Sequence, residues 1–169
     1  MIPEIGHILL IITFVASMLQ VVFWCYNIKK SDEITIDVLQ KSTFINFIFI
    51  LFSFGILVYS FIISDFSLVI VSDNSHTLKP LIYKISGTWG NHEGSLMLWI
   101  LILSFFTFLV SRKKNNISPK LLPSIIGIQT IILCLFLSFI LFTSNPFERV
   151  DTLPIDGNGL NPLLQDPGL

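Results

Sequence analysis

The sequence predicts an all-α, polytopic membrane protein with four transmembrane helices. It also predicts that both termini lie on the outer side of the membrane, in an intermembrane space or periplasm. Composition is the first reason, because 53% of the 169 residues are hydrophobic, 12% are charged and the mean hydropathy is +0.80. A soluble domain carries about 25% charged residues. The other two reasons are four long apolar segments and the distribution of basic residues between them.

Four segments are long and apolar enough to cross a bilayer, which requires about 20 mostly apolar residues. They cover residues 5–28, 43–64, 95–111 and 121–143. None of these segments contains Asp, Glu, Lys or Arg. Charged side chains within spans mark ion and proton pathways, so their absence argues against an ion pump or a voltage sensor. Residues 1–143 are therefore predicted to form one four-helix membrane domain.

The basic residues predict the orientation. Seven of the ten lie in two short connections, 29–42 and 112–120. Basic residues accumulate in the loops on the inner side of a membrane. The N-terminus, the long connection 65–94 and the tail 144–169 are then on the outer side. The net charge of −1 gives no reason to expect nucleic acid as a partner.

The outer connection 65–94 contains a short apolar run, a predicted turn over Ser72–Ser75 and a short helix that Pro80 could open. The apolar residues after Ser75 fall on one helical face. Two interpretations follow. The segment lies along the outer leaflet as an interfacial helix, or it is a loop packed on the ends of the spans.

The stretch GTWGNHEGSLMLW, residues 87–99, gathers unusual chemistry just before an apolar segment. It could be a reactive site, an anion-binding loop or the rim of a membrane helix. Either Asn91 or Ser95 can cap the third span. Glu93 suits the positive end of the helix dipole, and Trp89 suits the headgroup region. A helix entrance therefore explains most of the stretch but leaves His92 without a role.

The three histidines, His7, His76 and His92, are all predicted to lie on the outer side. No pair has the spacing of a helical metal site, and no Ser or Cys sits in a nucleophile motif. We therefore predict neither a catalytic residue nor a metal site. The residues retained as candidates near a cofactor are Trp89, Gly90, His92, Glu93, Gly94 and Ser95.

Four motifs resemble, in order and spacing, the CcmF/NrfE family of cytochrome c haem lyases of System I maturation. They are MIPEIGHILLI at 1–11, GTWGNHEGSLMLWILIL at 87–103, LFTSNPFERV at 141–150 and GLNPLLQDPGL at 159–169. The six candidate residues occupy the WGxHEGS position of that family. The sequence departs from the family in having four spans instead of more than ten. It also lacks the tryptophan-rich WWD segment and the haem-ligand histidines.

The resemblance implies the N-terminal subunit of a split haem lyase that helps form the surface where haem is attached to the CxxCH of apocytochrome c. It implies haem b in the assembled complex, with its ligands on partner chains, and leaves open whether this chain is itself enzymatic. The implied partners are the CcmF-type subunits carrying the WWD segment, a CcmH-type thiol protein, a haem-loaded carrier, apocytochrome c and the lipid bilayer. The tail 144–169 is expected to order on such a partner.

The location implied is the mitochondrial inner membrane, with the protein encoded in the organelle. The many residues with AT-rich codons, including 16 phenylalanines, and the lack of a signal-peptide pattern favour this interpretation. A prokaryotic source would instead imply the bacterial inner membrane. The alternative function is a non-catalytic structural subunit of another respiratory or transport complex.

Overall fold

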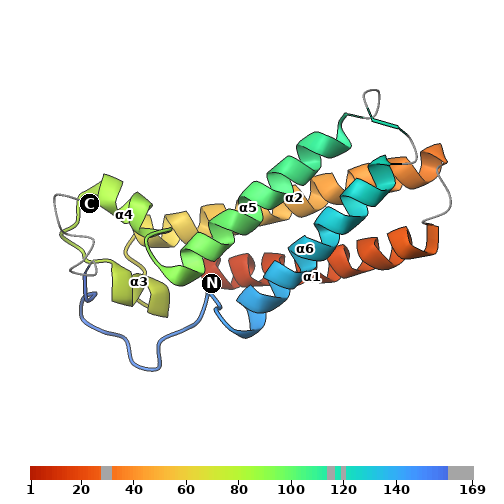
Figure 1. The fold of residues 1–169 in the computed structure, drawn as a ribbon. Helices are drawn as coiled ribbons and strands as arrows, with labels where there is room; N and C mark the ends of the chain where they lie inside the picture. The colour runs from red at the N-terminus through yellow and green to blue at the C-terminus, as the bar shows by residue number, and fades with distance from the viewer. Residues whose placement is uncertain (28–31, 114–116, 119–120, 160–169) are drawn as a thin grey trace.

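The computed structural model describes residues 1–27, 32–113, 117–118 and 121–159. Its regular secondary structure is helical apart from one isolated bridge between Leu68 and Arg149. Four long helices run back and forth as a bundle, and two short helices lie at one end of it (Figure 1). The helices are α1 (Ile2–Asn27), α2 (Glu33–Ile62), α3 (Val69–Asn74), α4 (Leu81–Gly87), α5 (His92–Ser111) and α6 (Leu122–Phe142).

The prediction of an all-α chain with four helices of membrane-spanning length is confirmed. Helices α1, α2, α5 and α6 each have 20 residues or more, and the most apolar window of each has a mean hydropathy of 2.1 or more. The start of α1 and the end of α6 lie at the same end of the bundle, because the four long helices alternate in direction (Figure 1). Which side of the membrane that end faces stays a prediction.

Helix α2 begins at Glu33, ten residues before the span predicted to start at 43. Asp32 caps the helix by accepting a hydrogen bond from the backbone amide of Thr35 (3.3 Å). The added turns alternate charged and apolar residues, with Ile36 and Leu39 buried, and carry an exposed ion pair between Lys41 and Asp37 (2.8 Å). A long uncharged apolar run marks only the part of a helix that lies in the bilayer, so the charge-containing turns before it were not predicted.

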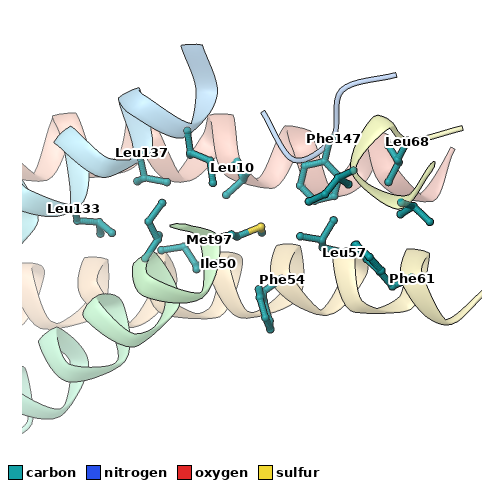
Figure 2. Close-up of a cluster of buried hydrophobic side chains, with 14 residues drawn as sticks. Leu10, Ile50, Phe54, Leu57, Phe61, Leu68, Met97, Leu133, Leu137 and Phe147 are labelled. Carbon is teal, nitrogen blue, oxygen red and sulfur yellow. The ribbon is translucent and has the colours of Figure 1, made fainter. Parts of the chain in front are cut away.

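The long helices pack side by side in the order α1, α2, α5, α6, and α6 returns to α1. Helix α2 also contacts α6 across the bundle. Figure 2 shows the largest apolar core between them. Leu10 of α1, Ile50 and Leu57 of α2, Met97 of α5 and Leu137 of α6 are all fully buried there. Every helix of the bundle therefore contributes to one common core.

A second buried cluster in the bundle is polar. The side-chain amide of Gln20 on α1 donates to Thr43 Oγ1 on α2 (3.0 Å) and to Thr130 Oγ1 on α6 (3.1 Å). Asn46 on α2 donates to Gln20 Oε1 (3.0 Å) and to Ser17 Oγ on α1 (3.1 Å). Each such bond contributes about 0.6 kcal/mol in a membrane protein. This cluster, which we call the glutamine network, links three helices without any charged group.

The two short helices differ in their surroundings. Ile70 and Val71 of α3 are buried, whereas Ile82 and Tyr83 of α4 are more than half exposed. The α3 segment therefore packs on the spans, whereas α4 has the exposed apolar face of an interfacial helix. The predicted turn over Ser72–Ser75 is wrong in its first three residues, which belong to α3. They continue the helix because Ser72 is buried and its amide donates to Leu68 O (2.9 Å).

The described part of the tail runs along α3. The amide of Val69 donates to Glu148 O (3.0 Å), and the amide of Val150 donates to Ser67 O (3.1 Å). Further on, the amide of Asn158 donates to Ser72 O (2.7 Å). We call this end of the molecule the loop end. It comprises α3, α4, the first turns of α1 and α5, and residues 144–159. The predicted ordering of the tail on a partner stays a prediction, and residues 160–169 lie outside the described residues.

Candidate functional site at the loop end

The turn between α4 and α5 is held together by Asn91. Its Oδ1 accepts a hydrogen bond from the amide of Gly94 (2.7 Å), which caps α5. Its Nδ2 donates to the carbonyl oxygens of Gly87 (2.9 Å) and Thr88 (3.4 Å) at the end of α4. Of the two predicted caps, Asn91 rather than Ser95 is therefore the one that forms. One side chain thus joins the end of one helix to the start of the next.

Two more residues of the WGxHEGS stretch are required by this turn. A Cβ atom on Gly94 would lie 1.6 Å from the carbonyl oxygen of Thr88, so only glycine fits there. The hydroxyl of Ser95 donates to Trp89 O (2.6 Å). The turn therefore constrains three neighbouring positions of the motif through direct contacts within the chain.

His92 is the residue of the stretch that the turn does not use. Its ring is exposed at the first position of α5, and it lies 6.3 Å from the ring of Phe139 on α6 between centroids. It forms no hydrogen bond or ion pair with another described residue. Glu93 follows in the first turn, where its charge suits the helix dipole. Trp89 is 40% exposed beside this position. An imidazole and an indole are therefore presented outward from a rigid corner.

His7 lies on α1 and contacts the tail through Asn145. Asn145 Oδ1 accepts the amide of Phe147 (3.0 Å) and lies 3.2 Å from His7 Nδ1. Because the oxygen of a side-chain amide can only accept hydrogen bonds, the bond between Asn145 Oδ1 and His7 requires Nδ1 of the ring to carry the proton. His7 also borders a cavity of about 480 Å³ whose other lining residues are Glu4, Ile8, Asn145, Phe147, Glu148 and Arg149.

The same cavity contains an ion pair between Arg149 and Glu4, and Arg149 also donates to Ser67 Oγ. These contacts tie the start of α1 to the tail and to the loop before α3. This cluster could not be predicted from the sequence, because its members are up to 145 residues apart. The only signal available was that both segments, 1–11 and 141–150, carry motifs of the same family.

His76 also contacts the tail, through Asp156. Its Nδ1 accepts a hydrogen bond from the amide of Leu78 (3.2 Å), and its Nε2 lies 3.3 Å from Asp156 Oδ2. Hydrogen bonds from the side chain and then the backbone amide of Thr77 keep the pKa of Asp156 below its ordinary value of 3.8, although partial desolvation opposes them. His76 and Thr77 therefore hold the tail by a carboxylate that stays charged.

Within the described ranges, no three His, Cys, Asp or Glu side chains come together in a way that could hold a metal ion. The six candidate residues are close together at one corner, whereas His7 and His76 belong to separate contacts. The corner is thus a surface that could bind a flat or apolar group through His92 and Trp89.

Comparison with known proteins decides the family. Residues 89–169 match the family model described as cytochrome C assembly protein. A cytochrome c-type biogenesis protein, CycK of Rhizobium meliloti, is 41% identical over the whole chain. CcmF of Escherichia coli is 38% identical, also over the whole chain, and a probable NrfE of the same species is 39% identical over 73% of it. The chain belongs to the CcmF/NrfE family of cytochrome c biogenesis proteins.

The chain spans about a quarter of the length of these family members: 25% of CycK, 26% of CcmF and 22% of NrfE. The fold agrees as well. The solved structure of the cytochrome c heme lyase CcmF matches 88% of this chain and 25% of that chain, with a TM-score of 0.78 and 24% identity. The four-helix arrangement is therefore that of a quarter of a CcmF/NrfE family protein.

Proposed function

We propose that the chain is the N-terminal part of a membrane cytochrome c haem lyase, and that its loop end helps form the surface where haem meets apocytochrome c. One observation supports this most. In a member of a cytochrome c biogenesis family, the corner of the WGxHEGS motif uses Asn91, Gly94 and Ser95 for its own structure. It leaves His92 exposed and without a hydrogen bond to any other residue that the structure describes.

The reaction would add a cysteine thiol of the apocytochrome CxxCH across a vinyl group of the haem. A carbon–sulfur bond forms, and the thiol proton goes to the other vinyl carbon, so no oxidant is consumed. The residues of this chain suit contact with a haem edge rather than its ligation. Trp89 offers an apolar face and His92 a hydrogen-bonding ring, while the ligands of haem b would lie on partner chains.

The partners in this proposal are the CcmF-type subunits with the WWD segment, a CcmH-type thiol protein, a haem-loaded carrier and apocytochrome c. The abundance of residue types with AT-rich codons, including 16 phenylalanines, supports a mitochondrial inner membrane location and a split lyase subunit. An antibody against the chain should then detect it in the inner-membrane fraction of purified mitochondria. If the chain were instead recovered from a bacterial inner membrane, the mitochondrial location would be wrong while the lyase proposal would still stand.

The proposal is tested by comparing His92→Ala with His76→Ala in cells that depend on this chain. We expect His92→Ala to lower the amount of haem-stained cytochrome c strongly while the level of the chain itself is unchanged. His76→Ala should have a smaller effect, because His76 only helps to hold the tail. If both variants left the amount of haem-stained cytochrome c nearly unchanged, His92 would not be part of the functional site.

A second experiment addresses the scaffold role. The chain purified without its partners should show no stoichiometric b-type haem spectrum, whereas the assembled complex should show one. Stoichiometric haem on the chain alone would contradict the proposal that the ligands are supplied by partners.

A further inference from the structure

The lipid-facing side of the bundle is not uniform, because α5 and α6 enclose a groove. We propose that this groove is the docking site for a transmembrane helix from the part of the lyase that this chain lacks. The inference rests on the proposed function. It identifies the face of the bundle to which the partner helix binds.

The groove has a volume of about 420 Å³ and is almost entirely apolar. Trp99, Ile102, Leu103 and Phe106 line it from α5, and Ile132 and Phe136 line it from α6. Trp99 is 61% exposed and Phe106 is 55% exposed. Helices associate in a bilayer mainly through close packing, because lipid is as apolar as their side chains. A concave surface of large side chains gives a facing helix that close packing.

Trp99 is an unusual residue to leave against lipid. Helix α5 has 20 residues, which is about 30 Å of helix and matches the hydrocarbon thickness of a bilayer. Trp99 is seven residues after His92, so it lies about 10 Å below the start of the helix. Tryptophan prefers the headgroup region, where its N–H finds an acceptor. Trp99 donates no hydrogen bond to another described residue. A facing helix could supply the missing acceptor.

The family comparison indicates what covers this face. The family model matches residues 89–169, a range that contains α5 and α6 but neither α1 nor α2. The relatives are about four times as long as this chain, since it covers 25% of CycK and 26% of CcmF. The relatives also match α1 and α2, because their similarity extends over the whole chain. If the chain is the N-terminal part of such a protein, as proposed, the further helices follow α6. Consecutive elements usually lie next to one another, so these helices would pack on α6 and its neighbour α5.

The test uses a photo-cross-linking amino acid placed at Ile102 or Phe106 in the assembled complex within native membranes. The matched control is the same amino acid at Leu19 on α1, which is 65% exposed on another face. We expect positions 102 and 106 to give a product that contains a lyase segment outside the matched quarter, and position 19 to give none. Lipid adducts alone, or a product with a second copy of this chain, would overturn the groove assignment.

The outcomes also separate this inference from the proposed function. Cross-linking of a lyase segment from position 19 and not from 102 would refute the groove while the subunit proposal stands. No lyase product from any position would refute both. As a second measurement, Ile132→Trp should fill the groove and lower co-purification of the partner by about fivefold or more. Leu19→Trp should leave co-purification unchanged, and an equal loss in the two variants would contradict the assignment.

Discussion

The middle of the bundle and the loop end use polar side chains in opposite ways. In the middle, the glutamine network consists of neutral groups that bond to one another across helices. At the loop end, charged groups and all three histidines gather, and His92 bonds to nothing among the described residues. Polar groups inside a membrane protein must be satisfied internally, whereas those at an end can be left for a ligand.

This difference assigns separate tasks to the two regions. The glutamine network in the middle links α1, α2 and α6 and so fixes how these three helices align. The loop end has two parts of its own. The tail contacts of His7, His76 and Arg149 are structural, and the corner of α4 and α5 is rigid but outward-facing. Substitutions in the middle should therefore change stability, and substitutions at the exposed part of the corner should change activity.

The largest effect is expected from Gly94→Ala, which tests whether the corner is as rigid as the bundle. The new Cβ would lie 1.6 Å from Thr88 O, so the backbone must move and the cap is lost. We expect a loss of about 3 kcal/mol in the free energy of unfolding. Thermal unfolding in detergent measures it. Gly55→Ala is the control, because nothing lies within 4 Å of its added Cβ and helix propensity improves.

The next effect should come from Gln20→Leu, which removes the centre of the glutamine network and keeps a similar volume. Three hydrogen bonds between helices are lost, and about 2 kcal/mol of stability should be lost with them. Ser138→Ala on α6 is the control, because its hydroxyl bonds only to the carbonyl of Leu135 in its own helix. Equal melting temperatures for the two variants would show that the glutamine network does not stabilise the packing of the helices.

A smaller and local effect is expected from Glu4→Gln, which breaks the ion pair with Arg149 and leaves the bundle core untouched. The segment 144–159 should be cut faster by a protease, while the unfolding of the four long helices is unchanged. Lys41→Gln breaks a different exposed pair, that with Asp37, and should not change the cutting. A parallel loss of helix stability in Glu4→Gln would mean that the loop end and the bundle are one cooperative unit.

The smallest effect is a pH dependence of the tail. The pKa of Asp156 is lower in the folded tail than its ordinary value of 3.8. The stabilisation of the tail by the charged carboxylate is therefore complete above pH 3.8. It should be lost as the pH falls below 3.8 and the carboxylate takes up a proton. The amide resonances of Asn158 and Gly159, whose N–H groups bond to α3 and its cap, should then shift. Asp156→Asn should abolish this pH dependence, and its persistence would point to another group.

Much of the fold could be predicted from the sequence. Four apolar segments without charge predict four spanning helices, and α5 and α6 lie within three residues of the expected bounds. The start of α2 and the helix α3 could not, because a capping carboxylate at Asp32 and the burial of Ser72 depend on local contacts rather than on apolarity. For the site, the motif identified the corner, but Asn91 and Ser95 were both plausible caps.

The sequence by itself determined the class of the protein and the resemblance of its motifs to the CcmF/NrfE family, because apolar length and motif spacing are local, linear properties. Only the tertiary structure decided which polar residues form hydrogen bonds or ion pairs with distant parts of the chain. The pairings of Gln20 with Thr130, of His7 with Asn145 and of Glu4 with Arg149 bridge 110 to 145 residues. Such contacts depend on how helices pack, and packing is not encoded in any single segment. The same packing distinguishes His92, exposed at the corner, from His7 and His76, which the sequence alone could not separate.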